Sequence, residues 1–229
     1  MWKLANITLV FKKKDKQLVK NYRPISLLPI CGKLFEKLVF NALYSYLNNN
    51  NLLSHNQSGF RPDDSTTNQL LYFVNEIHEA FEDKSLDVRA VFLDISKAFD
   101  KVWHDGLIFK IKQNGVHGKL LNLFENYLQN RRQRVALNGF YSDYAPIKAG
   151  VPQGSVLGPL LFLIYINDLE LNIKSNVKVF ADDTMLFSIV RTPHLTATEL
   201  NNDLDLINRW AYQWKMSFNP DPTKQATEV

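Results

Sequence analysis

The chain has 229 residues and a formal net charge of +4, with 45% hydrophobic and 22% charged residues. This length fits one large domain or two small joined ones, and the composition excludes a disordered chain, a collagen-like repeat and a disulfide scaffold. The single cysteine excludes an internal disulfide, and the most apolar run, residues 160–166, is too short to cross a bilayer, so we expect an intracellular protein, nuclear or cytoplasmic, with no membrane partner.

Helical periodicity alternates with short apolar runs along the whole chain. The predicted helices cover residues 32–47, 65–82, 105–114, 119–129, 157–168 and 196–214. The predicted strands cover residues 88–93, 133–138, 141–149, 177–181 and 184–188. In the helix at 65–82 the side chains expected to face the core are Leu70, Phe73, Val74, Ile77 and Phe81. Because helices and strands interleave and the hairpins are antiparallel, the predicted fold class is α+β or mixed α/β.

Positive charge is concentrated in two segments. Residues 1–24 carry +6 and residues 110–134 carry +5, whereas the rest of the chain carries −7. This segregation favours a polyanionic partner such as a nucleic acid. A solvated loop and a solvated helix end explain the same charges equally well.

Acidic side chains follow two apolar strands that are about ninety residues apart in the sequence. Asp182 and Asp183 separate the strands at 177–181 and 184–188, and Asp94 ends the strand at 88–93. A surface turn and a strand-end cap would explain these residues separately. If the strands are neighbours in one sheet, three carboxylates converge, and they would need divalent cations to stay ionised together. An all-oxygen ligand set favours Mg²⁺ or Mn²⁺ over zinc.

Five sequence blocks, in this order, resemble the reverse transcriptase domain of non-LTR (LINE-like) retrotransposons, especially the jockey type. The blocks are NYRPISLLP at 21–29, QSGFR at 57–61, FLDISKAFD at 92–100, GVPQGSVLGP at 150–159 and FADD at 180–183. A lone Ala-Asp-Asp would be weak evidence, but five blocks in order are specific, and the resemblance covers nearly the whole chain.

The resemblance implies one reverse transcriptase domain over residues 1–229, with about 1–90 mostly fingers and about 91–229 mostly palm. It implies a right-hand polymerase fold whose antiparallel palm sheet is backed by helices. The family would continue past Val229 into a primer-gripping segment and a thumb, so we expect this chain to lack the thumb and to bind primer weakly. The implied activity is RNA-directed DNA synthesis, with an RNA or DNA template, a DNA primer and deoxynucleoside triphosphates as partners. The oligomeric state is left open.

The resemblance also implies roles for individual acidic and aromatic residues. Asp94 and Asp182 would be the principal ligands of two Mg²⁺ or Mn²⁺ ions, with Asp183 completing the site. Because neighbouring strand residues point to opposite faces, sequence alone leaves ligation by Asp183 open. Phe99 would collide with a ribose 2′-hydroxyl and so select deoxynucleotides, although core packing would also explain this ring.

Further residues would contact the nucleotide or the nucleic acid. Gln153 and Gly154, in the Pro-Gln-Gly turn, would lie against the incoming nucleotide, and Arg61 and Arg23 would clamp its triphosphate. Arg61 has the alternative of pairing with an acid of the following Asp-Asp. The side chains expected to track template or primer phosphates are Lys12, Lys13, Lys14, Arg131, Arg132 and Arg134. Lys224 occupies a block where related enzymes place a lysine, but its spacing differs from theirs, which leaves its role open.

Three functions are compatible with these residues. The first is an active RNA-directed DNA polymerase domain, favoured by the intact carboxylates and Gln153. The second is a catalytically inactive, nucleic-acid-binding remnant of a retrotransposon. The third is a two-metal nuclease, which would need the same acids but would not explain Phe99 or the Pro-Gln-Gly turn.

Overall fold

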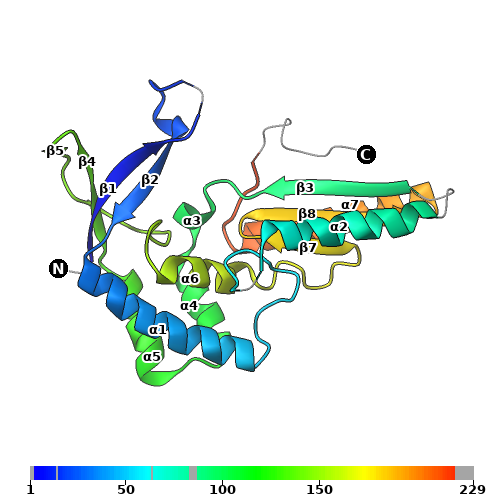
Figure 1. Ribbon diagram of the computed structural model, residues 1–229. Helices are drawn as coiled ribbons and strands as arrows, with labels where there is room; N and C mark the ends of the chain where they lie inside the picture. Colours follow the sequence, from blue (N-terminus) through cyan, green and yellow to red (C-terminus); the bar gives the residue numbers. More distant parts are fainter. Residues whose placement is uncertain (1–2, 14, 63, 83–86, 220–229) are drawn as a thin grey trace. The chain divides into compact units, whose positions relative to one another are not determined.

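The chain forms two compact units, each built from two separate stretches of sequence (Figure 1). The computed structural model describes residues 3–13, 15–62, 64–82 and 87–219. Unit 1 comprises Met1–Leu52 and Phe99–Tyr165, and unit 2 comprises Leu53–Ala98 and Ile166–Val229. Both units combine helices with strands, which confirms the predicted fold class. The assignment of fingers and palm to parts of the chain stays a prediction.

Unit 1 contains a mixed sheet whose first two strands were not predicted. Its strands are β1 (Leu4–Phe11), β2 (Tyr22–Leu27), β4 (Arg132–Leu137), β5 (Phe140–Tyr141) and β6 (Ala145–Pro146). The order is β2-β1-β4-β5, with β6 also paired to β4; β1 runs antiparallel to β2 and parallel to β4. The hairpin predicted at Asn138-Gly139 is present, and both residues have positive φ, as a tight two-residue turn requires.

The helices of unit 1 surround a strongly apolar central helix. They are α1 (Ile30–Asn49), α4 (His104–Gln113), α5 (Gly118–Leu128) and α6 (Leu157–Ile166), with a short helical turn η1 (Val19–Asn21) before β2 and a short α3 (Ala98–Lys101) at the start of the second stretch. Nearly every side chain of α6 is buried, as its continuous apolar sequence predicts. A buried carboxylate, Glu36 of α1, accepts hydrogen bonds from the backbone N–H groups of Val156 and Leu157, at 2.7 and 3.3 Å, and so caps this helix.

Unit 2 is a three-stranded antiparallel sheet with a helix on each face. The strands, in the order β3-β8-β7, are β3 (Asp87–Asp94), β8 (Asp183–Val190) and β7 (Asn176–Phe180), and the helices are α2 (Thr66–Glu82) and α7 (Pro193–Gln213). The helix α2 packs through Phe73, Ile77 and Ala80 against one face of the sheet. The other face carries Ser188, whose hydroxyl donates a hydrogen bond to the hydroxyl of Ser175. The Ser175 hydroxyl donates in turn to Asp203 of α7. Figure 1 shows α2 and α7 on opposite sides of the strands.

The apolar side of α2 is narrower than the sequence predicted. Of the residues expected to face the core, Phe73 and Ile77 do so, but Leu70, Val74 and Phe81 are exposed. The contact with the sheet follows one row of side chains, at positions 73, 77 and 80, because a helix lying on a flat sheet touches it along a single line. The prediction was therefore wrong for three of the five positions.

None of the helices within the described ranges is both long enough and apolar enough to span a bilayer.

A buried acid of α7 holds the segment that leads into β7. Asp203 is 2% exposed, and its carboxylate accepts hydrogen bonds from the backbone N–H of Lys174, the backbone N–H of Ser175 and the Ser175 hydroxyl. A carboxylate this deeply buried is tolerated because its oxygens are satisfied. It ties the loop before β7 to the helix that covers the sheet.

Replacing Asp203 with alanine is expected to lower the free energy of unfolding by about 2–4 kcal/mol, because two backbone donors and a hydroxyl lose a charged acceptor. Urea unfolding followed by circular dichroism measures the change. Asp205→Ala is the matched control, since Asp205 lies exposed on the same helix and should change stability by no more than about 0.5 kcal/mol. Equal effects of the two substitutions would contradict this account of Asp203.

Candidate functional site

Two of the predicted acidic residues face each other across paired strands of unit 2. Asp94, the last residue of β3, is directly opposite Asp183, the first residue of β8. Opposite residues of an antiparallel pair place their side chains on the same face, with Cβ atoms about 4.5–5.5 Å apart. The structure therefore brings together carboxylates that are far apart in the sequence.

The third acid, Asp182, lies in the tight turn between β7 and β8. Phe180 pairs with Asp183, so only Ala181 and Asp182 form the turn, and Ala181 has a φ of +56°. Positive φ is uncommon for a residue with a Cβ, which makes this turn a strained point of the backbone. The carbonyl of Asp182 accepts a hydrogen bond of 3.2 Å from the N–H of Ile95, and this bond ties the turn to the end of β3.

A segment that precedes α2 holds this turn in place. The Oε1 atom of Gln57 accepts hydrogen bonds from the N–H groups of Ala181, at 3.0 Å, and Gly59, at 2.7 Å. The N–H of Ser58 donates to the carbonyl of Val179, and Val179 donates in turn to the carbonyl of Asn56. We call residues 56–59 the turn clamp. Sequence reasoning had used this block only to recognise the family resemblance and had assigned Gln57 and Gly59 no role.

Gly59 is the point of closest contact between the turn clamp and the turn. A Cβ atom built on it would lie 2.9 Å from Ala181 Cα and from the Phe180 carbonyl carbon, and closer still to the Ala181 nitrogen. These neighbours are backbone atoms, which cannot rotate away. Only glycine fits this position without moving the turn.

Asn219, which sequence reasoning also missed, orients Asp94. The side-chain amide of Asn219 donates to Asp94 Oδ2 at 3.2 Å, and its backbone N–H donates to the Asp94 carbonyl at 2.8 Å. Asn219 belongs to the block that had drawn attention for Lys224, and Lys224 itself lies outside the described residues. A side chain that fixes a neighbouring carboxylate limits the positions from which that carboxylate can bind a ligand.

The surroundings of the acids fit a hard divalent cation. A cavity of about 490 Å³ in unit 2 is lined by Asp94 and Asp183, by strand residues beside them and by side chains of α2. Across the described ranges, no three Asp, Glu, His or Cys side chains already converge in an arrangement that could hold an ion. Mg²⁺ needs no such cage, because it keeps several waters and is usually bound by one or two carboxylates together with substrate phosphates. The paired carboxylates therefore provide suitable donors.

Arg61 lies at the end of the loop that contains the turn clamp, and its side chain hydrogen-bonds to the backbone of that loop. Its Nη1 donates to the carbonyl of Ser54 at 2.7 Å. Burial raises the pKa of Asp64, but hydrogen bonds from Ser58, Ser65 and Asn68 and the charge of Arg61 outweigh it, so the pKa is lowered. The sequence had left open whether Arg61 clamps a ligand or pairs with a neighbouring acid, and its charge does act on Asp64.

Unit 1 contains the predicted nucleotide-contacting residues Phe99, Gln153 and Gly154. The Phe99 ring stacks on Phe162 with centroids 4.9 Å apart and an interplanar angle of 19°. The side-chain amide of Gln153 donates to Asp100 Oδ1 at 2.9 Å, and the backbone carbonyl of Gln153 accepts from Ser26 N–H at 2.7 Å. Gly154 has a φ of +107°, and a Cβ there would lie 2.8 Å from the Ser26 carbonyl oxygen, so the turn requires glycine.

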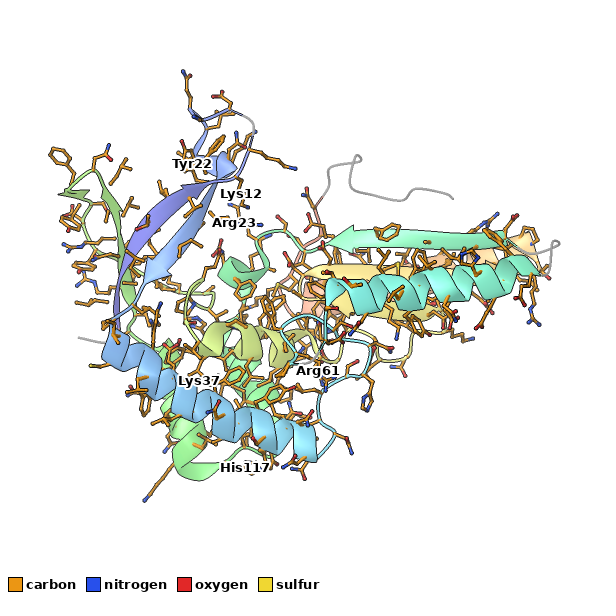
Figure 2. All side chains as sticks on the ribbon, viewed as in Figure 1. Lys12, Tyr22, Arg23, Lys37, Arg61 and His117 are labelled. Atoms are coloured by element: carbon orange, nitrogen blue, oxygen red, sulfur yellow. The ribbon has the colours of Figure 1, made fainter. Side chains whose placement is uncertain are left out.

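The predicted phosphate-binding side chains do not share one environment. Figure 2 shows Lys12 and Arg23 on the hairpin formed by β1 and β2, and both are exposed, as is Lys13, whereas Lys14 lies outside the described residues. On β4, Arg132 is exposed and Arg134 half-buried; the Arg134 guanidinium lies over the Tyr141 ring, 4.0 Å from its centroid. Arg131 is only 2% exposed, so its expected place among the surface arginines is not supported.

Comparisons with known proteins give a consistent result. The profile of a family described as reverse transcriptase (RNA-dependent DNA polymerase) matches residues 11–229. The RNA-directed DNA polymerase from the mobile element jockey of Drosophila melanogaster is 35% identical over 235 residues, which cover 99% of this chain and 25% of that protein. The probable RNA-directed DNA polymerase from transposon BS of the same species is 36% identical, over 97% of this chain and 25% of that protein.

A solved structure shares the fold at low sequence identity. Apo telomerase from Candida tropicalis superposes with a TM-score of 0.69 at 11% identity, covering 100% of this chain and 44% of that one. At this identity the likeness concerns the fold alone. The chain spans about a quarter of the length of the two curated relatives, 25% of each.

Gly59→Ala is expected to lower the free energy of unfolding by about 1–3 kcal/mol, because the added methyl group overlaps the backbone of the turn. Urea unfolding measures the loss. The matched control is Gly32→Ala on α1, where a Cβ would meet no atom within 4 Å, so stability should stay unchanged or rise by up to about 1 kcal/mol. If Gly59→Ala were as stable as Gly32→Ala, the close contact between the turn clamp and the turn would be wrong.

Proposed function

The chain belongs to the reverse transcriptase family, and on that premise we propose that it carries the polymerising centre of an RNA-directed DNA polymerase. The observation that carries the proposal is the register of β3 and β8, in which Asp94 lies opposite Asp183 and next to the turn that bears Asp182. Two separate blocks of the family resemblance thus meet at one end of a sheet. The proposed reaction adds a deoxynucleotide to a DNA primer on an RNA or DNA template.

In the proposed reaction the primer 3′-oxygen forms a bond to the α-phosphorus of the nucleotide as the bond to pyrophosphate breaks. Asp94 and Asp182, with Asp183 beside them, would hold two Mg²⁺ or Mn²⁺ ions, which supply positive charge to the attacking oxygen and the departing pyrophosphate. The chain itself holds the metal-binding carboxylates in position. The turn clamp holds the backbone of Ala181 beside Asp182, and Asn219 orients Asp94.

Selection of the nucleotide is assigned to the residues that the family resemblance names. Phe99 would exclude a ribose 2′-hydroxyl, and the stack on Phe162 would keep its ring from turning away. Gln153 and Gly154 would lie against the nucleotide, with the backbone of the turn already fixed by Ser26. The family resemblance supports these roles. Arg61 and Arg23 would bind the triphosphate, for which a guanidinium is well suited because it donates several hydrogen bonds in a plane.

Contacts with the template and primer are assigned to basic residues that are exposed or half-buried. Lys12 and Lys13 follow β1 directly, while Arg132 and Arg134 lie on β4 beside Tyr141 and Tyr144. Arginines next to aromatic rings suit a nucleic-acid partner, because the cations bind phosphates and the rings offer surfaces for stacking. Such contacts give affinity without sequence preference.

The proposal predicts metal-dependent primer extension that requires Asp182. On poly(rA)·oligo(dT), the purified chain should incorporate dTTP with Mg²⁺ or Mn²⁺ and lose incorporation on chelation, while Asp182→Asn should lower it by at least about a hundredfold. Asp205→Asn, an exposed change in the same unit, serves as the control with unchanged incorporation. Equal incorporation by wild type and Asp182→Asn would defeat the catalytic assignment of Asp182. No incorporation by folded wild type would instead support the inactive nucleic-acid-binding remnant.

A further prediction concerns the choice between a ribonucleotide and a deoxyribonucleotide. Phe99→Val should raise the ratio of UTP to dTTP incorporation on the same template by at least about tenfold, because the ring that meets the 2′-hydroxyl is removed. Loss of the stack lowers total activity as well, whereas the ratio reports sugar selection alone. Phe162→Leu weakens the stack but keeps the Phe99 ring, so its ratio should rise less than that of Phe99→Val. If the ratio is unchanged in Phe99→Val, Phe99 only packs against Phe162 and does not select the sugar.

A further inference from the structure

The hairpin of β4 and β5 carries cations and aromatic rings on one of its two faces. Side chains alternate along a strand, so Arg132 and Arg134 project from the same side of β4. Ala136 lies on that side too and pairs with Tyr141, which places the Tyr141 ring beside Arg134. Both guanidinium groups also lie over the ring of Tyr144. We call the side chains of Arg132, Arg134, Tyr141 and Tyr144 the cation–aromatic face.

Contacts within the cation–aromatic face hold its rings in place. The Arg134 guanidinium lies 4.0 Å from the centroid of the Tyr141 ring and 4.8 Å from that of the Tyr144 ring. Arg134 is itself anchored, because its Nε donates to Asn6 Oδ1 of β1 at 2.9 Å. Arg132 donates to the Tyr144 carbonyl at 3.1 Å. A ring already fixed on one side loses little freedom when a second flat group stacks on its other side.

The Tyr141 ring is accessible to a partner. Tyr141 is 57% exposed although a guanidinium covers one side of its ring, and Arg132 is exposed beside it. Residues 132–148 contain three cationic side chains and one acid, Asp143, so the charge around the ring is positive. An exposed aromatic ring next to fixed cations matches the two parts of an unpaired nucleotide, because a base stacks on a ring and a phosphate binds a guanidinium.

The cation–aromatic face is turned away from the turn that contains Gln153. Gln133 lies between the two arginines in the sequence and projects from the other side of β4, where it lines a cavity of about 190 Å³ within unit 1 together with Gln153. Leu137 and Phe140 pair with each other and belong to that other side as well. The proposed function puts the incoming nucleotide against Gln153. A strand on the cation–aromatic face is therefore not the stretch that pairs with this nucleotide.

We propose that the cation–aromatic face binds an unpaired stretch of nucleic acid, with a base stacked on Tyr141 and phosphates bound by Arg132 and Arg134. The inference rests on the proposed function, since it takes the nucleic acid that the polymerase copies as the partner, and it adds that the bound stretch is single-stranded. A duplex keeps its bases stacked on one another and would offer this face only phosphates. The shared chemistry of RNA and DNA, a base and a phosphate, is what the face recognises.

The test measures binding of fluorescein-labelled oligo(rA) to the full chain by fluorescence anisotropy, without metal ion or nucleotide. Tyr141→Ala should weaken this binding at least about fivefold, because the stacking surface is lost, and should leave binding of an abasic ribose-phosphate strand of equal length unchanged. The matched control is Phe140→Ala, which removes the neighbouring ring. That ring is 81% exposed but lies on the other side of the hairpin, so binding should stay as in wild type.

Two further measurements separate stacking from charge and RNA from DNA. Arg132→Gln should weaken binding of oligo(rA) and of the abasic strand alike, because it removes a phosphate contact. Oligo(dA) should bind within about threefold of oligo(rA), since neither an aromatic ring nor a phosphate contact reads the 2′-hydroxyl. A tenfold or greater preference for oligo(rA) over oligo(dA) would make the face a reader of ribose and overturn the proposal.

Other outcomes also overturn the proposal. Equal affinity for oligo(rA) and the abasic strand would mean a surface that binds charge alone, and tighter binding of an rA·rU duplex would mean a duplex reader. Equal losses in Tyr141→Ala and Phe140→Ala, or no loss in either, would exclude a stack on Tyr141. If Tyr141→Ala does not fold, photocrosslinking of oligo(5-bromouridine) to wild type decides, since the proposal requires the nucleotide on Tyr141 and not on Phe140.

Primer extension on poly(rA)·oligo(dT) reports the polymerising centre separately. Absent extension with a fivefold or greater effect of Tyr141→Ala on oligo(rA) binding would contradict the proposed function and support this inference. Normal extension with no effect of Tyr141→Ala on binding would overturn this inference and leave the proposed function standing.

Discussion

The pairing of β3 with β8 is the constraint on which the arrangement of the acidic residues depends. Side chains alternate between the faces of a strand, so a slip of one residue would turn Asp94 away from the face that holds Asp183. Two features oppose such a slip. The two-residue turn after Phe180 fixes where β8 begins, and Gln57 holds the N–H of Ala181 from outside the sheet. The turn clamp therefore fixes the turn from which β8 begins, and the hydrogen bond from Ile95 N–H to the Asp182 carbonyl ties that turn to the end of β3.

Buried polar side chains perform the same task elsewhere, by joining segments that are distant in sequence. Glu36 accepts backbone donors 120 residues away at the start of α6, and Asp203 accepts them at the loop before β7. Each of these acids satisfies donors that would otherwise be unpaired in the interior, so each is specific for one arrangement of the chain. Apolar contacts alone would allow neighbouring arrangements of similar energy, because they have little directional preference. Each unit is built from two separate stretches of sequence, so directional hydrogen bonds are needed to fix how its segments pack together.

The sequence predicted local features well and long-range partners poorly. The hairpin carrying Asp182, the strand ending at Asp94 and the apolar helix α6 follow from patterns within a few residues, and the structure contains all three. The strand β1 was missed because one of its partners, β4, lies 128 residues further along the chain. Gln57 was assigned no role for a similar reason, since its polar side chain has no periodic signature and its partner, Ala181, is 124 residues away. The sequence signal for this contact was Gly59, a glycine within the block QSGFR at 57–61.

Charge counted along the sequence also differs from charge presented at the surface. The segment 110–134 contains six cationic residues, but Lys110 and Arg131 are buried, at 5% and 2% exposed. Lys110 donates to the carbonyl of Tyr165, and Arg131 donates to the carbonyl of Tyr127, so neither side chain is placed to contact a phosphate at the surface. Arg132 and Arg134 are two residues apart on β4, and alternation puts them on the same side of the strand, beside Tyr144. One short basic run thus divides into two arginines on β4 beside aromatic rings and one buried arginine over the Tyr127 ring, a division that a count of charges along the sequence does not reveal.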